Sequence, residues 1–169
     1  MTTLQTRVVR LSVADAGEIL TLQRAAYVTE AQCHDDIMMP PLTQSLEQLR
    51  SELADPRCIA WGIRDSGRLV ASLRVSLIDE STAEIRRAVV APDRQGAGLG
   101  TALLQAAEQR LPGAVTTVRL FTGEHSEANL RLYVRLGFQV TGRTPAGRYD
   151  LVHLAKARSP SLATSHNDR

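Results

Sequence analysis

The sequence is poor in lysine and in aromatic residues, and each scarcity excludes a class of protein. Lys156 is the only lysine among 20 basic residues, and 18 acidic residues reduce the formal net charge to +2. This balance argues against a surface built to bind nucleic acid. Aromatic residues make up 4% of the chain, too few for the stacking platforms that bind single-stranded nucleic acid.

Cysteines and long apolar runs are also scarce. Cys33 and Cys58 lie far apart and form no CxxC pair, so we expect free thiols in a reducing compartment rather than a disulfide scaffold. No apolar run approaches the ~18 residues of a membrane span, and residues 1–10 hold no apolar signal core. We therefore expect a cytoplasmic protein without a membrane partner, either a monomer or a homodimer.

The length and composition fit one α+β domain. The chain has 169 residues, of which 43% are hydrophobic, and it shows neither an internal repeat nor an interdomain linker. We predict a single domain over residues 1–157. The remaining residues, 158–169, are rich in turn formers and polar side chains, so we predict a flexible tail there.

Hydrophobic periodicity predicts the order of the elements. Helices should begin at Ser12-x-x-Asp15 and at the capping box Ser45-x-x-Gln48, with a connecting loop over 34–41. Gly137 should end the last helix in a left-handed conformation. Further helices are predicted over 99–111 and 126–136, and strands over 6–12, 58–64, 68–78, 82–90, 115–121, 138–141 and 148–155.

A glycine-rich loop, Gln95-Gly-Ala-Gly-Leu-Gly-Thr101, lies between a predicted strand and an amphipathic helix. Glycines allow a tight turn there and leave N–H groups open at a helix N-terminus, where phosphate binds. A Walker loop would need lysine after Gly100, and a dinucleotide fingerprint would need glycine at Thr101 or Leu103. A glycine-rich turn without a ligand is the alternative interpretation.

The motif Gln95-x-x-Gly98-x-Gly100, preceded by Val90-Ala91-Pro92, resembles the acyl-CoA loop of the GCN5-related N-acetyltransferase superfamily. The resemblance extends from about Arg7 to Lys156. It implies an α+β fold with a mixed, mostly antiparallel sheet of about six or seven strands, splayed between the fourth and fifth strands and flanked by about four helices.

The resemblance also implies acetyl-CoA as a co-substrate. Backbone groups of two segments would hold it, the first binding the pyrophosphate and the second pairing with the pantetheine arm. The first segment is Gln95, Gly96, Ala97, Gly98, Leu99, Gly100 and Thr101, and the second is Ala88, Val89 and Val90. Arg94 adjoins the glycine loop in the sequence. Arg131 and Arg135 lie on the last predicted helix, which the resemblance places beside the loop, so these three guanidinium groups could reach the phosphates of the cofactor.

Tyr133 is the candidate general acid. It stands four residues before Gly137-Phe138, where related sequences carry a tyrosine that protonates the departing thiolate. A phenol of pKa near 10 suits that transfer. A core tyrosine is the alternative interpretation. Related sequences often have a cofactor-binding asparagine where this chain has Ser126, so Asn129 is either a substitute cofactor contact or a helix cap.

Glu84 is the candidate general base, because its spacing from Gly98 matches the strand glutamate of histone-acetylating members. Strand alternation predicts Glu84, Arg86 and Ala88 on one face, opposite Ile85 and Val89. The alternative is an exposed glutamate paired with an arginine.

Four further residues are candidates for the acceptor pocket: Tyr27, Glu30, His34 and His125. By resemblance, the first helix and the loop after it shape this pocket, and the acidic residues around His34 would favour a cationic amine there. A solvated acidic loop is the alternative that the sequence favours. His34-Asp35-Asp36 has no recognised metal spacing, so we expect no metal.

These observations predict transfer of an acetyl group from acetyl-CoA to the amine of a small molecule, directly within a ternary complex. One alternative is acetylation of a protein or peptide amine. The other is a module that binds acyl-CoA without turnover.

Overall fold

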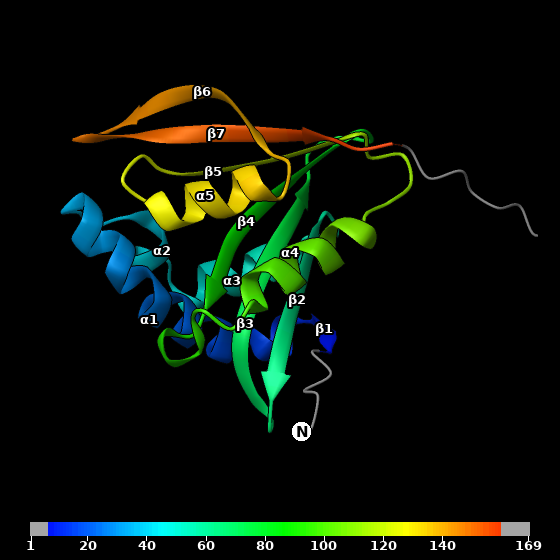
Figure 1. Cartoon of the computed structure of the whole chain (residues 1–169). Coiled ribbons are helices and arrows are strands. Elements are labelled where there is room, and N and C mark those ends of the chain that lie inside the picture. The colour runs from blue at the N-terminus through cyan, green and yellow to red at the C-terminus, as the bar shows by residue number, and fades with distance from the viewer. Residues whose placement is uncertain (1–6, 160–169) are drawn as a thin grey trace, which may run out of the picture.

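Seven strands form one mixed sheet in the computed structural model, which describes residues 7–159 (Figure 1). Their spatial order is β1-β2-β3-β4-β5-β7-β6, and every neighbouring pair is antiparallel except β4 and β5. The predicted mixed, mostly antiparallel sheet is thereby confirmed. The strands are β1 (Val8–Leu11), β2 (Cys58–Asp65), β3 (Arg68–Leu77), β4 (Thr82–Val90), β5 (Thr117–Gly123), β6 (Gln139–Ala146) and β7 (Tyr149–Ala157).

Helices cover both faces of the sheet. Helices α1 and α3 pack on the face of β2–β4 that carries Arg74, and α4 packs on the opposite face (Figure 1). None of the helices within residues 7–159 is both long and apolar enough to cross a membrane. The helices of this described part are α1 (Ala16–His34), α2 (Pro40–Thr43), α3 (Leu46–Ala54), α4 (Leu99–Gln109) and α5 (Glu127–Arg135), with short 3-10 turns at Val13–Asp15 and Pro92–Arg94.

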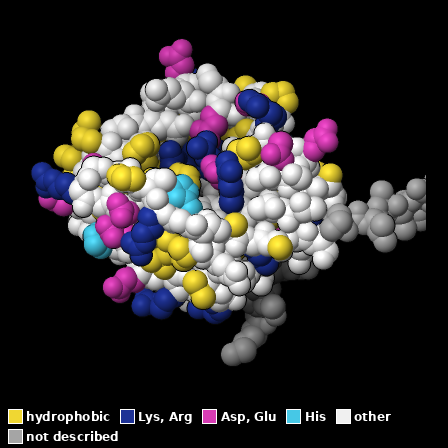
Figure 2. All heavy atoms as spheres, turned by 90° about the horizontal axis from the view of Figure 1, so that it is seen from above, with side chains coloured by type: hydrophobic (Ala, Val, Ile, Leu, Met, Phe, Trp, Pro, Cys, Tyr) yellow, Lys and Arg dark blue, Asp and Glu magenta, His cyan; other side chains and the backbone are white. Residues whose placement is uncertain are grey.

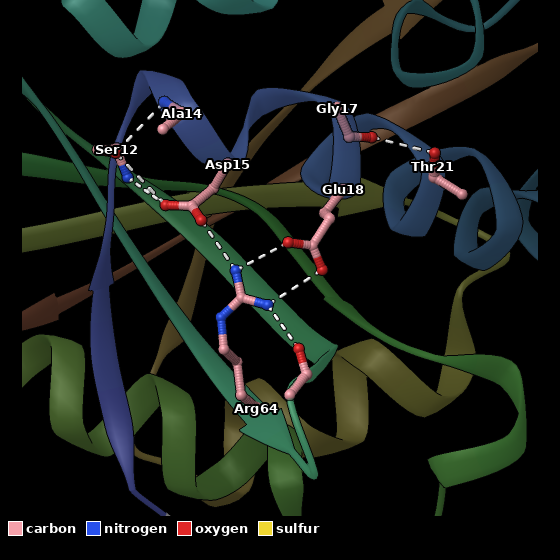
Figure 3. Close-up of polar contacts among 8 residues, drawn as sticks. Ser12, Ala14, Asp15, Gly17, Glu18, Thr21 and Arg64 are labelled. Atoms are coloured by element: carbon pink, nitrogen blue, oxygen red, sulfur yellow. Dashed lines mark hydrogen bonds and ion pairs between the residues drawn. The ribbon is translucent and has the colours of Figure 1, made fainter.

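Hydrogen-bonded caps begin the first helical segments as predicted. The Ser45 hydroxyl accepts from the Gln48 N–H at 3.1 Å, and the Gln48 side chain accepts from the Ser45 N–H at 2.9 Å. The Ser12 N–H donates to the Asp15 carboxylate at 2.8 Å (Figure 3). These reciprocal bonds satisfy N–H groups that the first turn of a helix leaves without partners.

The guanidinium of Arg64 joins β2 to the start of α1. It donates to Asp15 at 2.8 Å and to both oxygens of Glu18 at 3.0 Å (Figure 3). The hydrogen bond from Arg64 holds the pKa of the Glu18 carboxyl below its usual range. This contact fixes the helix that carries part of the site to the sheet.

Two segments differ from the sequence prediction. Residues 40–43 form the short helix α2 where a loop was predicted, because the fixed φ of proline suits the first turn of a helix. The β6–β7 hairpin is longer than predicted and continues to Ala146. The strand passes through Pro145 because β6 is an exposed edge strand, where proline costs no ladder hydrogen bond.

The first residue of the predicted tail contacts the domain. The backbone N–H of Arg158 donates to the Thr116 carbonyl at 2.8 Å, and its guanidinium donates to the carbonyls of Pro112, Val115 and Leu111. Arg158 is therefore bound to the body of the domain. The rest of that tail, residues 160–169, and the predicted first strand residue Thr6 lie outside the described residues.

Gly62 marks a point in β2 where the core has no room for a side chain. A Cβ at this position would lie 2.7 Å from Leu11 Cδ1 and 2.8 Å from Leu69 Cδ1. We expect Gly62→Ala to lower the free energy of unfolding by about 1–3 kcal/mol in urea denaturation, the range found for overpacked cores. The matched control is Gly142→Ala on β6, where a Cβ meets nothing within 4 Å. Equal losses in the two variants would contradict this account of the core.

Strands β4 and β5 are paired only at one end. The parallel ladder joins Thr82–Glu84 to Thr117–Arg119 and then stops, although both strands continue. Beyond the ladder the two strands separate, and residues 85–90 of β4 and 120–123 of β5 line one cavity. This is the splay between the fourth and fifth strands that the resemblance implied.

Candidate active site

The cavity between the separated strands has a volume of about 760 Å³. Most residues predicted from the sequence to form the site line it, although they come from α1, β4, the glycine loop, α4 and α5. They are Tyr27, Glu30, His34, Ala88, Val89, Val90, Gln95, Gly96, Gly98, Leu99, Gly100, Thr101, Asn129 and Tyr133. The predicted residues that do not line it are Glu84, Ala97 and His125.

The glycine loop presents an array of free hydrogen-bond donors to this cavity. Gly96 and Gly98 have φ angles of 80° and 79°, in the left-handed region that favours glycine. Gly98 is the N-cap of α4, and no side chain caps the helix. Within the described chain, no backbone N–H from Gln95 to Thr101 donates a hydrogen bond. Such an array at a helix N-terminus is an anion site.

Two of the three arginines considered near the loop lie at the cavity. Arg94 and Arg135 line it, and Arg94 also forms an ion pair with Asp65. Arg131 does not line it, and its side chain is 73% exposed, 4.0 Å from Glu127. On the face of the molecule seen in Figure 2, basic and acidic side chains stand beside one another rather than in separate areas.

Tyr133 on α5 turns its hydroxyl toward the cavity. Its side chain is almost fully buried and packs edge-on against Phe138, with ring centroids 6.1 Å apart. Among residues 7–159 the hydroxyl has no hydrogen-bond partner, yet it is not sealed from the cavity. Burial raises the pKa of Tyr133 well above its usual value, so the phenol keeps its proton. The arrangement suits a proton donor.

The end of α5 positions this tyrosine. Gly137 adopts a φ of 97°, as predicted for the residue that ends the helix. The N–H of Phe138 donates to the Tyr133 carbonyl at 3.0 Å, and the N–H of Gly137 donates to the Val134 carbonyl at 3.1 Å. This pair of bonds is a Schellman motif, which turns Phe138 back against the helix. One turn earlier, Asn129 donates to the Thr122 hydroxyl at 3.4 Å, joining α5 to β5.

The structure places Glu84 away from this cavity. One oxygen lies 2.9 Å from Arg86 Nε and the other 2.8 Å from Arg119 Nε, which is the arginine-paired alternative raised from the sequence. Glu84 instead lines a second cavity, of about 550 Å³, between β4, β5 and the β6–β7 hairpin. Both oxygens of Glu84 are thus paired, and the residue lies outside the cavity that holds most of the predicted site residues.

A bulge in β4 explains why alternation misplaced this strand. Arg86 pairs with Arg74 and Val89 with Ser72, so Arg87 and Ala88 together oppose the single residue Leu73. Arg87 takes the left-handed conformation, with a φ of 53°. Each residue after the bulge is therefore shifted to the other face, and the prediction that Ile85 and Val89 share a face is wrong.

His34 is a structural residue of the cavity wall. Its Nδ1 lies 2.9 Å from the Glu30 carbonyl, which can only accept, and its Nε2 lies 3.1 Å from the His125 N–H, which can only donate. We assign the neutral tautomer with the proton on Nδ1 from these two partners. Both nitrogens are thus engaged, and Gly123 packs so closely that a Cβ there would lie 2.2 Å from Nε2.

Two other contacts complete the wall at this end. Ser126 donates its hydroxyl proton to the Glu30 carboxylate, so the residue at the expected asparagine position contacts α1 instead. The Tyr149 hydroxyl, at the start of β7, donates to Asp36 at 2.8 Å. These bonds join α1 and the loop after it to α5 and the β6–β7 hairpin.

The described residues hold no group of three or more side chains suited to bind a metal ion. Cys33 is exposed and Cys58 is buried, and both are free thiols. Neither cysteine lines the cavity.

Comparison with known proteins identifies the family. The model of the acetyltransferase (GNAT) family matches residues 19–138, well over half of the chain. The chain belongs to the GNAT family. A search of curated proteins found no match.

Solved structures show how widely the GNAT fold is shared. The ribosomal-protein-S18-alanine N-acetyltransferase of Escherichia coli has a TM-score of 0.74 at 22% identity, covering 95% of this chain and 98% of that one. The PaiA N-acetyltransferase of Thermoplasma acidophilum, in complex with coenzyme A, has a TM-score of 0.73 at 17% identity, covering 92% and 100%. A spermidine N-acetyltransferase chimera of Vibrio cholerae SpeG and hSSAT has a TM-score of 0.71 at 19% identity, covering 90% and 95%.

One cavity residue of this GNAT chain, Arg87, was not predicted from the sequence although its backbone is left-handed and its side chain is charged. Arg87 lines the cavity from the bulge of β4 and was not among the candidates. Its signal was the adjacent pair Arg86–Arg87, since unbroken alternation would place one of the two arginines on a buried face.

Proposed function

We propose that this GNAT chain transfers the acetyl group of acetyl-CoA to the amine of a small molecule, directly within a ternary complex. The observation that supports this proposal most directly is the run of free N–H groups from Gln95 to Thr101, beside a cavity between separated strands. These donors fit the pyrophosphate of coenzyme A. The unpaired backbone of β4 beside the cavity fits the amide-containing pantetheine arm, which can bind as an added strand does.

The cavity residues support a division of roles in the reaction. The amine nitrogen attacks the thioester carbonyl carbon, a C–N bond forms, and the C–S bond breaks. Tyr133 is the candidate to give its phenolic proton to the departing thiolate, because it lines the cavity and its hydroxyl has no other partner among the described residues. Burial raises its pKa, which keeps the phenol protonated but makes it a weaker acid than an exposed tyrosine. Glu30 is the only carboxylate that lines the cavity among the described residues, and it is the candidate to take the proton from the acceptor ammonium.

The acceptor must be found by experiment, since the similar structures carry names of enzymes with different acceptors, ribosomal protein S18 and spermidine. The purified chain should be given acetyl-CoA with a panel of simple amines, amino acids, aminoglycosides and peptides, and released thiol should be measured. We expect at least one small amine to raise thiol release above that from acetyl-CoA alone, with intersecting lines in initial-rate plots.

Two results would contradict the proposal in different ways. Binding of coenzyme A with no acceptor-dependent thiol release would favour the module without turnover. Parallel lines in the initial-rate plots, together with an acetylated protein in the mass spectrum, would replace direct transfer with a covalent intermediate.

A further inference from the structure

Arg87 is an unusual cation in the cavity of this chain. It is partly buried, it lines the cavity, and its backbone has a φ of 53°, a conformation that is strained for a residue with a Cβ. Burial lowers the pKa of Arg87, although an arginine keeps its charge in a protein. A strained backbone that carries a partly desolvated charge indicates a functional position.

The guanidinium of Arg87 has no direct ion-pair partner among the described residues, although the charge of Glu52 acts on it and opposes the effect of burial on its pKa. Within residues 7–159 no acidic side chain forms an ion pair with it, whereas Arg74, Arg86 and Arg94 pair with Glu52, Glu84 and Asp65. Removing an unpaired cation from water is costly unless a ligand supplies the counter-charge. Arg87 therefore favours an anion in the cavity.

A second, deeper cation reinforces this preference. Arg74 lies opposite Arg86 in the sheet and is 1% exposed. Its Nε donates to Glu52 at 2.8 Å, but its Nη1 is buried without a hydrogen-bond partner in the described chain. The charge of Arg74 acts on Arg87, and it helps to lower the pKa of that guanidinium. Glu52 therefore pairs with Arg74, but the partnerless Nη1 leaves part of this guanidinium unsatisfied beside the β4 bulge.

Glu30 supplies the opposite charge in the same part of the cavity. Tyr27, Glu30 and Arg87 all line the cavity, and the charges of Glu30 and Arg87 both act on the phenol of Tyr27. Tyr27 and Glu30 lie one turn apart on α1, so they share a face of that helix. The cavity therefore offers a carboxylate for an ammonium group and a guanidinium for an anion.

We infer that the acceptor carries a carboxylate as well as its amine, as an amino acid does, and that Arg87 binds this carboxylate. The inference rests on the proposed function, because it names the class of acceptor for the same reaction. A guanidinium can bind a carboxylate through two parallel hydrogen bonds. With the carboxylate held at Arg87, the amine of the same small molecule can lie near Glu30.

The test compares acceptors that differ only in the carboxylate: L-phenylalanine with phenethylamine, L-lysine with cadaverine, and L-alanine with ethylamine. We expect kcat/KM to favour at least one amino acid over its decarboxylated partner by about 10- to 100-fold, the range of a charged hydrogen bond. Arg87→Gln should abolish this preference, chiefly through KM for the amino acid, and Arg87→Lys should restore part of it.

Controls separate this role from others. Arg119→Gln removes an arginine that lies outside the larger cavity, and it should leave the preference unchanged. The KM for acetyl-CoA should be the same in Arg87→Gln and in the natural chain, whereas an increase would make Arg87 a coenzyme A contact and overturn the inference. An equal preference in Arg87→Gln and the natural chain, or no preference in the natural chain, would also overturn it.

Direct binding keeps the inference separate from the proposed function. The same three pairs should be titrated calorimetrically into the protein saturated with coenzyme A, where no transfer occurs. Tighter binding of the amino acids, lost in Arg87→Gln, would support the inference even if no acceptor released thiol and the proposed function failed. Equal binding within each pair would overturn the inference even if thiol were released.

Discussion

Tyr133→Phe is expected to lower kcat by about 10²- to 10⁴-fold, the usual contribution of a positioned general acid, while acetyl-CoA binds as before. The change removes one oxygen that has no hydrogen-bond partner in the described chain, so folding and packing against Phe138 should survive. Because the pKa of Tyr133 is raised, its protonated form persists at higher pH than that of an exposed tyrosine. The activity of the natural chain should therefore show no alkaline loss from this group near pH 10.

The matched control is Tyr149→Phe, which removes another hydroxyl at the same cavity, one that donates to Asp36. Tyr149→Phe should lower the free energy of unfolding by roughly 1 kcal/mol, and it should lower kcat far less than Tyr133→Phe does. Steady-state rates and calorimetric titration with coenzyme A distinguish the two variants. If Tyr133→Phe kept kcat within about threefold, Tyr133 would be only a core residue, which is the alternative interpretation of this buried side chain.

Gly100→Glu is expected to weaken the binding of acetyl-CoA by about 10²-fold. Gly100 lies in the first turn of α4, and a Cβ there would meet Val90 and Leu132 at 3.7 and 3.8 Å, which are ordinary contacts. The backbone therefore tolerates the side chain. The new carboxylate would repel the pyrophosphate and compete for the free N–H groups at the helix N-terminus. Calorimetric titration with coenzyme A measures the loss.

Gly17→Glu is the control, because Gly17 is an exposed helical glycine near the start of α1 and a Cβ there meets nothing within 4 Å. Acetyl-pantetheine, which lacks the nucleotide and its pyrophosphate, provides a second comparison. Its use as a donor should suffer much less from Gly100→Glu than the use of acetyl-CoA. Unchanged affinity for coenzyme A in Gly100→Glu would show that the loop does not bind the pyrophosphate.

The sequence could predict the parts of the site that depend on local rules. The loop from Gln95 to Thr101 and the turn at Gly137 both require glycine for a left-handed backbone, and such positions can be recognised without knowledge of the tertiary structure. Tyr133 was selected by resemblance, since related sequences carry a tyrosine four residues before the glycine of that turn. The alternation of hydrophobic residues likewise predicted most strands to within a few residues.

The remaining residues depend on contacts that local rules do not contain. The bulge at Arg87 adds one residue to β4 and reverses the faces of every residue after it, so a prediction from period two fails there. His34 resembled a substrate ligand because its partners, the Glu30 carbonyl and the His125 N–H, are backbone groups without a sequence signature. The choice between the two interpretations of Glu84 could not be made from the sequence, because its partner Arg119 belongs to a parallel strand 35 residues away.

The short ladder between β4 and β5 divides the sheet mechanically. Strands β1 to β4 form one continuously paired half of the sheet, and strands β5, β7 and β6 form the other. Within the sheet, the two halves pair only where Thr82–Glu84 meets Thr117–Arg119. The edges of β4 and β5 that face the gap have no partner strand, and such an edge can pair with another extended chain. A cofactor bound along that gap would contact the unpaired edges of both β4 and β5 and so connect the two halves of the sheet. Binding of the acetyl donor would then be coupled to the local opening of both halves of the sheet. Amide hydrogen exchange should therefore slow in β1–β4 and in β5–β7 together when coenzyme A is bound.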